Sequence, residues 1–144
     1  MTPAAGRAAV HTGESPMETS KRAYLKWAMI ATGIAFLLID PLMHLWPSGW
    51  AWTPSQSEYE QMIVGVYATL GIFLLWASRN PEAHLTLIWF TVWSSLVHGG
   101  IMAVQAVVDG SEHCHLLGDV PALLIVAIVL AALTPRRTME RTAA

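Results

Sequence analysis

The sequence predicts an all-α polytopic membrane protein, built as an antiparallel bundle of four transmembrane helices. Three features predict this class. The 144 residues are 54% hydrophobic and only 12% charged, whereas soluble domains carry about 25% charged residues. Four apolar runs approach the length of about 20 residues that a membrane-spanning helix needs. All Lys and Arg residues lie before or at the start of the first span, in the connector after the second span or in the C-terminal tail, which is typical of a membrane protein with a fixed orientation.

The chain divides into a transmembrane domain and two short tails. Residues 1–20 are small and polar, and we expect them to form a disordered cytoplasmic tail. The transmembrane domain covers residues 21–135, and residues 136–144 form a second cytoplasmic tail. The four spans are expected at about 24–46, 59–78, 84–108 and 117–134. Pro41, inside the first span, is expected to kink or end that helix.

The distribution of positive charge predicts the orientation of the bundle. The eight Lys and Arg residues are Arg7, Lys21, Arg22, Lys26, Arg79, Arg136, Arg137 and Arg141. None of them lies between the first and second spans or between the third and fourth. Because Lys and Arg are retained on the cytoplasmic side, both termini are predicted to be cytoplasmic, and these two connectors face outward from the inner (plasma) membrane.

Small residues are predicted at the contacts between helices. Helices in lipid gain no hydrophobic free energy by associating, so they depend on close packing, which small residues allow. The third span offers Ser95, Gly99 and Ala103 on one face, and the second span offers Gly65 and Thr69. Short connectors favour antiparallel neighbours. The sequence therefore predicts close helix contacts along these faces.

The Trp residues are interpreted as anchors at the membrane boundaries, where the indole ring is favoured. Trp27 and Trp76 are expected near the inner boundary, and Trp46, Trp50 and Trp52 near the outer one. A ligand cage formed by the outer Trp cluster is the alternative interpretation.

Two ionisable residues fall in the outer third of the predicted spans. At a rise of 1.5 Å per residue, Asp40 in the first span and His98 in the third both lie about 20 Å from the cytoplasmic boundary. An ionisable group at that depth must face the bundle interior, a partner or water. The sequence therefore predicts a buried Asp40–His98 pair in an outward-facing polar pocket.

Further polar residues gather at the outer end and predict a metal site. The "EHCH" connector places His113 and His115 at the mouth of the fourth span. The candidate metal ligands are His98, His113, His115, Asp40, His44 and Asp119, with Gln105, Glu112 and Glu58 as residues that orient them. Imidazole and carboxylate ligands suit copper or zinc. No HExxH or paired CxxC motif accompanies them, so no reaction is predicted.

Each of these residues also has a structural interpretation. His113 and His115 fit solvated loop residues, and His98 fits a core histidine. Asp40 fits a helix terminator, and Asp119 fits the N-cap of the fourth helix. At the level of function, one alternative is a small accessory membrane subunit whose polar core only fixes helix packing. The other is a membrane protein that binds a lipid or quinone, or that handles protons.

The lipid bilayer is the predicted partner, with a homo-oligomer or a larger membrane complex as open alternatives. No basic stripe suited to nucleic acid is present. Three stretches, "IDPLMHLWP", "WSSLVHGGIMAVQA" and "HLLGDVPALL", lie between Lys21 and Arg137. In these stretches the chain resembles small bacterial four-span integral membrane proteins of uncharacterised function. The resemblance implies the fold and carries no activity.

Overall fold

The computed structural model describes residues 16–51 and 57–135, and within these ranges the regular structure is helical throughout. The helices are α1 (Pro16–Leu37), α2 (Ile39–Leu45), α3 (Pro47–Trp50), α4 (Ser57–Ala77), η1 (Pro81–His84), α5 (Leu85–Val108), η2 (Gly110–Leu117) and α6 (Asp119–Leu133). The all-α prediction is therefore confirmed for the described residues. α1 begins at Pro16, inside the segment 1–20 that composition assigns to a tail.

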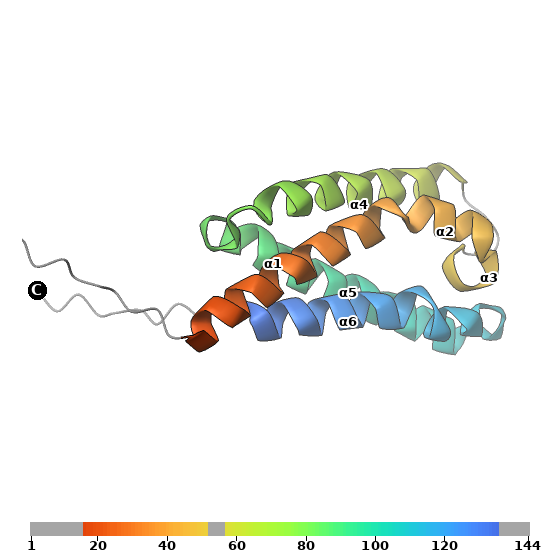
Figure 1. Cartoon of the computed structure of the whole chain (residues 1–144). Helices are drawn as coiled ribbons and strands as arrows, with labels where there is room; N and C mark the ends of the chain where they lie inside the picture. Colours follow the sequence, from red (N-terminus) through yellow and green to blue (C-terminus); the bar gives the residue numbers. More distant parts are fainter. Residues whose placement is uncertain (1–15, 52–56, 136–144) are drawn as a thin grey trace, which may run out of the picture.

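The four long helices α1, α4, α5 and α6 lie side by side, and consecutive ones run in opposite directions (Figure 1). The start of α1 and the end of α6 share one end of the molecule, while α2, α3 and η2 occupy the other. We refer to the end with α2, α3 and η2 as the η2 end. α1 packs mainly on α4, and α5 packs mainly on α6, whereas α4 touches α5 only sparsely. The molecule thus consists of two close helix pairs with a looser junction between them.

One stripe of each long helix is buried, as the 3.6-residue period requires. On α5 the buried stripe includes Ile88, Ser95 and Met102. The opposite face of the same helix exposes large apolar side chains such as Phe90 and Ile101. A helix that is apolar on every side is typical of a membrane span rather than of a helix bathed in water.

Two helical stretches of the described residues are long and apolar enough to cross a membrane, Pro81–Val108 and Gly110–Leu133. A third span results if Glu18–Leu37 and Ile39–Leu45 are taken as one bent helix pair. Gln61–Ala77 is apolar but shorter than the length tested. Two or three candidate spans therefore stand against the four that the sequence predicts.

The first predicted span, 24–46, is not one straight helix. Its two parts meet at Leu38 and are bent by 53°. Pro41 explains the break, because it has no N–H to donate to the carbonyl of Leu37 and its ring crowds that carbonyl. In a straight helix Asp40 would continue the buried face of α1 that ends at Phe36. The bend turns that face away, and no residue of α2 is buried.

Glycines allow the closest approach between helices. A Cβ atom on Gly71 of α4 would lie 2.7 Å from the carbonyl oxygen of Gly33 of α1, so neither position has room for a side chain. The predicted contact at Gly99 is present, since a Cβ there would lie 3.2 Å from Cβ of Leu123 on α6. The predicted contact at Gly65 is wrong, because nothing lies within 4 Å of its Cβ position.

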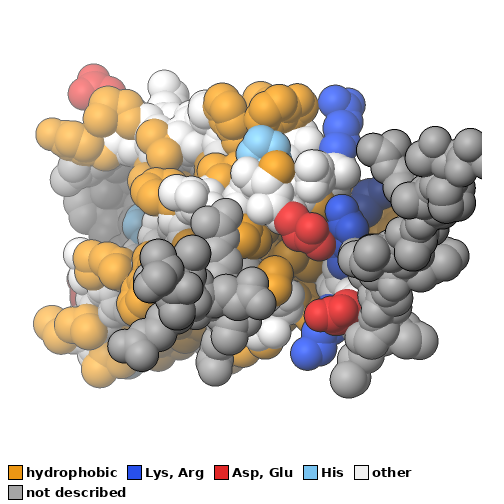
Figure 2. Space-filling view, turned by 90° about the vertical axis from the view of Figure 1, so that its left-hand side faces the viewer, with side chains coloured by type: hydrophobic (Ala, Val, Ile, Leu, Met, Phe, Trp, Pro, Cys, Tyr) orange, Lys and Arg blue, Asp and Glu red, His pale blue; other side chains and the backbone are white. Residues whose placement is uncertain are grey.

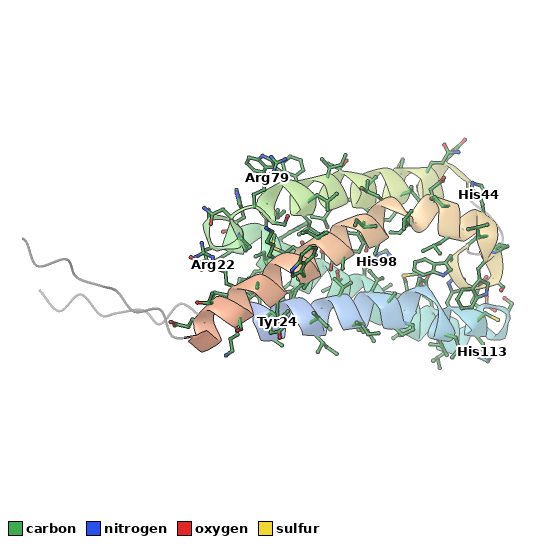
Figure 3. All side chains as sticks on the ribbon, viewed as in Figure 1. Arg22, Tyr24, His44, Arg79, His98 and His113 are labelled. Atoms are coloured by element: carbon green, nitrogen blue, oxygen red, sulfur yellow. The ribbon has the colours of Figure 1, made fainter. Side chains whose placement is uncertain are left out.

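Charge is distributed unevenly along the bundle. Lys and Arg side chains gather on one side of the molecule, and hydrophobic side chains cover much of the remaining visible surface (Figure 2). Figure 3 places Arg22 and Arg79 toward the end where α1 begins, and His44 and His113 at the η2 end. His98 lies on α5 between these two groups. His44 and His113 thus lie at the opposite end of the bundle from Arg22 and Arg79.

Candidate functional site

The most buried ionisable groups form a short array at the junction of η2 and α6. Nε2 of His115 lies 3.1 Å from Oε2 of Glu112, and Nδ1 of His115 lies 2.9 Å from Oδ2 of Asp119. The His115 side chain is fully buried, and both carboxylates are nearly so. We call Glu112, His115 and Asp119 the carboxylate–histidine cluster.

The local sequence explains why the cluster forms. Asp109 ends α5 and caps η2, because its Oδ1 accepts hydrogen bonds from the backbone N–H of Ser111 (3.0 Å) and from the Ser111 hydroxyl (2.6 Å). In a 3₁₀-helix the side chains at i and i+3 stand above each other, which brings Glu112 to His115. Asp119 follows His115 by four residues, at the first position of α6.

Asp119 does not act as the N-cap that the sequence suggests. Gly118 occupies the cap position of α6, and no side-chain capping bond is formed there. The carboxylate of Asp119 instead turns back to the imidazole of His115. A capping role for Asp119 is therefore wrong, and its side chain faces inward.

The cluster places one imidazole between two carboxylates inside the protein. Buried ionisable groups are normally paired or hydrogen-bonded, and here they pair with one another. The sequence has no Lys or Arg between Arg79 and Arg136.

A cavity of about 230 Å³ lies beside the cluster, between the two helix pairs. Its polar or aromatic lining residues are Trp50, Tyr67, His98, Gln105 and Asp119. Its apolar lining includes Ile39, Met43, Ile63, Val64, Met102 and Leu123. Asp119 belongs to both features, and its carboxylate is the only acidic group in the described wall of this cavity. We call this cavity the Asp119 pocket.

Aromatic rings form one side of the Asp119 pocket. The ring of Tyr67 meets the ring of His98 edge to face, with centroids 5.5 Å apart, and Phe36 packs behind Tyr67 at 4.8 Å. Asp119 is close enough to act electrostatically on both Tyr67 and His98. The indole Nε1 of Trp50 is buried and has no acceptor among the described residues. The pocket therefore combines an anion, an N–H donor and aromatic faces in an apolar surround.

The predicted Asp40–His98 pair is wrong. Asp40 lies on the surface of α2, where it is 62% exposed and its Oδ2 is 3.9 Å from Nε2 of His44, itself 80% exposed. The bend before α2 turns both side chains away from the bundle. His98 faces the Asp119 pocket from α5, so the acidic group that it meets is Asp119 rather than Asp40.

The predicted metal ligands do not come together. Across residues 16–51 and 57–135, no three His, Cys, Asp or Glu side chains are arranged to hold a metal ion. His113 and Glu58 are exposed, and Asp40 with His44 forms a separate surface pair. Of the predicted residues only His98, Gln105, Glu112, His115 and Asp119 belong to the cluster or the pocket. The copper or zinc prediction therefore has no support in the described residues.

Sequence reasoning missed the aromatic side of the pocket. Trp50 is interpreted above as a boundary anchor, but it lines the Asp119 pocket. Tyr67 is not among the predicted site residues, although a tyrosine within an apolar run is a usable signal, because its hydroxyl needs a polar partner when the ring is buried.

A larger hollow of about 550 Å³ lies at the opposite end, between the start of α1 and the end of α6. Two of its charged lining residues already pair with each other, since Nε of Arg22 lies 3.3 Å from Oε1 of Glu82. That hollow contains no histidine or aromatic side chain among its described lining residues. The Asp119 pocket is therefore the better candidate site.

Comparison with known proteins gives a family and no activity. No curated protein and no solved structure matches the chain. The model of a family of unknown function, DUF6632, matches residues 19–144. The matched region contains the carboxylate–histidine cluster and every residue of the Asp119 pocket. The chain therefore belongs to the DUF6632 family of unknown function.

Proposed function

We propose that the chain is a four-span protein of the inner membrane, with both termini in the cytoplasm and the η2 end facing outward. The bent pair α1–α2 would form the first span, and α4, which is 21 residues long, would form the second. The position of Arg22 and Arg79 toward the opposite end, and the absence of Lys and Arg from the sequence of the two connectors at the η2 end, support this orientation. Apolar side chains exposed on the long helices support contact with lipid.

We propose further that the Asp119 pocket binds a small, mostly apolar molecule with a polar head. The observation that carries this proposal is the carboxylate of Asp119, a residue only 6% exposed, in a wall that is mostly apolar and aromatic and also contains His98 and Gln105. An ionisable group inside a membrane domain is costly and is typical of a functional site. Apolar cavities with a few convergent polar groups are the usual form of small-molecule sites.

The size and position of the pocket narrow the ligand. At about 230 Å³ it is smaller than most drug-binding pockets, which measure about 300–1,000 Å³. Gln105 lies at its exposed edge on α5, next to the sparse junction with α4. A ligand of one ring and a short polar group fits this space and has a path from the bilayer or from the outer surface.

Benzyl alcohol is a suitable probe, because it has one ring and one hydroxyl. We expect saturable binding to the protein in lipid nanodiscs, measured by saturation-transfer NMR. Leu123→Trp, which fills the pocket, should abolish that binding. Ile125→Trp, an equal change at an exposed position of the same helix, should leave it intact. Equal binding to both variants, or none to the wild type, would contradict the proposed function.

A further inference from the structure

We propose that the ligand of the Asp119 pocket is a ring compound with a carbonyl group, whose oxygen accepts hydrogen bonds from the hydroxyl of Tyr67 and the indole N–H of Trp50. This inference rests on the proposed function, since it specifies the ligand class of the same pocket. It follows from two donors in the pocket wall, from the acceptors beside them and from the lipid around the protein.

The indole N–H of Trp50 is a donor without an acceptor. Its Nε1 is buried, and no hydrogen-bond partner is present for it within residues 16–51 and 57–135. An indole can donate a hydrogen bond but cannot accept one, and a buried donor that makes no bond is destabilising. Trp50 lines the Asp119 pocket, so an oxygen atom in the pocket is a suitable acceptor.

The hydroxyl of Tyr67 is the second donor. Tyr67 is only 8% exposed and lines the same pocket. Its ring packs against Phe36 and His98, and its hydroxyl makes no hydrogen bond to any residue that the structure describes. A buried tyrosine hydroxyl normally has a hydrogen-bond partner. A molecule in the pocket can supply that partner without any change in the packing of the ring.

The described wall of the pocket offers these donors few acceptors. The carboxyl group of Asp119 already lies against His115, with 2.9 Å between Oδ2 and Nδ1. His98 meets Tyr67 ring to ring, edge to face, with centroids 5.5 Å apart. Gln105 lies at the exposed edge of the pocket. An oxygen on the ligand is therefore the acceptor that Trp50 and Tyr67 call for.

A carbonyl oxygen suits the site better than a hydroxyl. A carbonyl only accepts hydrogen bonds, and it has two lone pairs for two donors, whereas a hydroxyl brings a further proton that needs an acceptor of its own. The hydrocarbon of a bilayer contains no donors. A ketone that moves from lipid into the pocket thus gains hydrogen bonds without losing any, and its ring can pack against the aromatic side chains of the wall.

Two shape-matched probes test the ligand class. Acetophenone has one ring and one carbonyl, and α-methylstyrene has a CH₂ group in place of the carbonyl oxygen. Both affinities are referred to the probe concentration in the lipid of the nanodiscs. We expect wild-type protein to bind acetophenone about fivefold more tightly or better, because the analogue leaves the donors of the wall unpaired. Leu123→Trp, which fills the pocket, should abolish binding of both probes.

Removal of a single hydroxyl tests the donor. Tyr67→Phe keeps the ring and should reduce the preference for acetophenone to about twofold or less, with little change in the affinity for α-methylstyrene. Tyr59→Phe, which removes an exposed hydroxyl from the same helix, is the matched control and should change neither affinity. A preference that Tyr67→Phe leaves unchanged overturns the proposal.

A second measurement uses only the wild type, and so holds even if Tyr67→Phe fails to fold. Infrared difference spectra of acetophenone with a ¹³C-labelled carbonyl report the hydrogen bond, because accepting one lowers the C=O stretching frequency. We expect the bound probe to absorb below its frequency in an alkane solvent. A bound frequency equal to the alkane value, or no preference for acetophenone over α-methylstyrene, overturns the carbonyl proposal and leaves the pocket standing. If neither benzyl alcohol nor acetophenone binds, the proposed function fails as well.

Discussion

Nδ1 of His115 lies 2.9 Å from Oδ2 of Asp119, and this contact joins the 3₁₀-helix η2 to the first turn of α6. Oε2 of Glu112 lies 3.1 Å from the other ring nitrogen. The imidazole thus lies between two buried carboxyl groups. His115 is therefore the residue that joins Glu112 to Asp119.

Replacement of His115 should destabilise the fold. His115→Ala leaves two buried carboxylates without the group between them, and loss of one member of a buried charge pair costs about 3–5 kcal/mol. We expect a lower free energy of unfolding in detergent, followed by circular dichroism. His113→Ala, at an exposed position of the same helix, should have little effect. Similar losses for both variants would argue against a special role for His115.

The contact between α1 and α4 should depend on Gly71. Gly71→Leu forces a side chain against the backbone of Gly33, and overpacking of this kind costs about 1–3 kcal/mol. Thermal unfolding in detergent measures the loss. Gly65→Leu, on the same helix where the Cβ position is open, should unfold like the wild type. The packing described for α1 and α4 is wrong if the Gly65 variant is the less stable of the two.

The positions of α4, α5 and α6 could be predicted from sequence to within about two residues, because apolar run length and breakers such as Pro81 determine them locally. The start of α1, the break at Leu38 and the helix η2 could not. The direction of the bend before Pro41 could not be predicted. A proline shows that a helix is interrupted, but the packing of α2 beyond it decides where Asp40 points. The predicted depth of Asp40 in the membrane therefore could not show that its side chain lies near His44 rather than His98.

The cluster itself was only partly visible in the sequence. Glu112, His115 and Asp119 were all recognised as polar residues of the outer end, but a loop interpretation of the "EHCH" connector hides their alignment. Once η2 is helical, the spacing of three and four residues places both carboxylates on one imidazole. Glycine contacts between distant segments, such as Gly33 with Gly71, likewise depend on tertiary packing.

Low pH should loosen the start of η2 through Asp109. Hydrogen bonds from Ser111 hold the pKa of the Asp109 carboxyl below its ordinary value of 3.8. Because the pKa is lowered in the folded state, its stabilising effect is present above pH 3.8 and is lost as the pH falls through the folded pKa. A ¹³C NMR titration measures this pKa, and Ser111→Ala should raise it. A wild-type pKa at or above 3.8 would contradict the capping geometry.

The proposed orientation can be tested through Cys114, which is exposed in η2. A membrane-impermeant maleimide should label it in cells whose outer envelope is permeabilised and whose inner membrane is intact. As a control, Ser20→Cys in a Cys114→Ser background should react only after lysis, because Ser20 lies at the positively charged end. Labelling of Ser20→Cys before lysis, together with no labelling of Cys114 in the wild type, would indicate the opposite orientation.

The most direct test of the Asp119 pocket is to determine which residues benzyl alcohol contacts when it binds. Met43 of α2 and Met102 of α5 line the pocket, whereas Met62 of α4 is exposed outside it. With ¹³C-methyl methionine in nanodiscs, the probe should shift the Met43 and Met102 methyl signals saturably and show nuclear Overhauser contacts to both. The account is contradicted if the probe contacts Met62 alone, or if Met43 and Met102 do not respond.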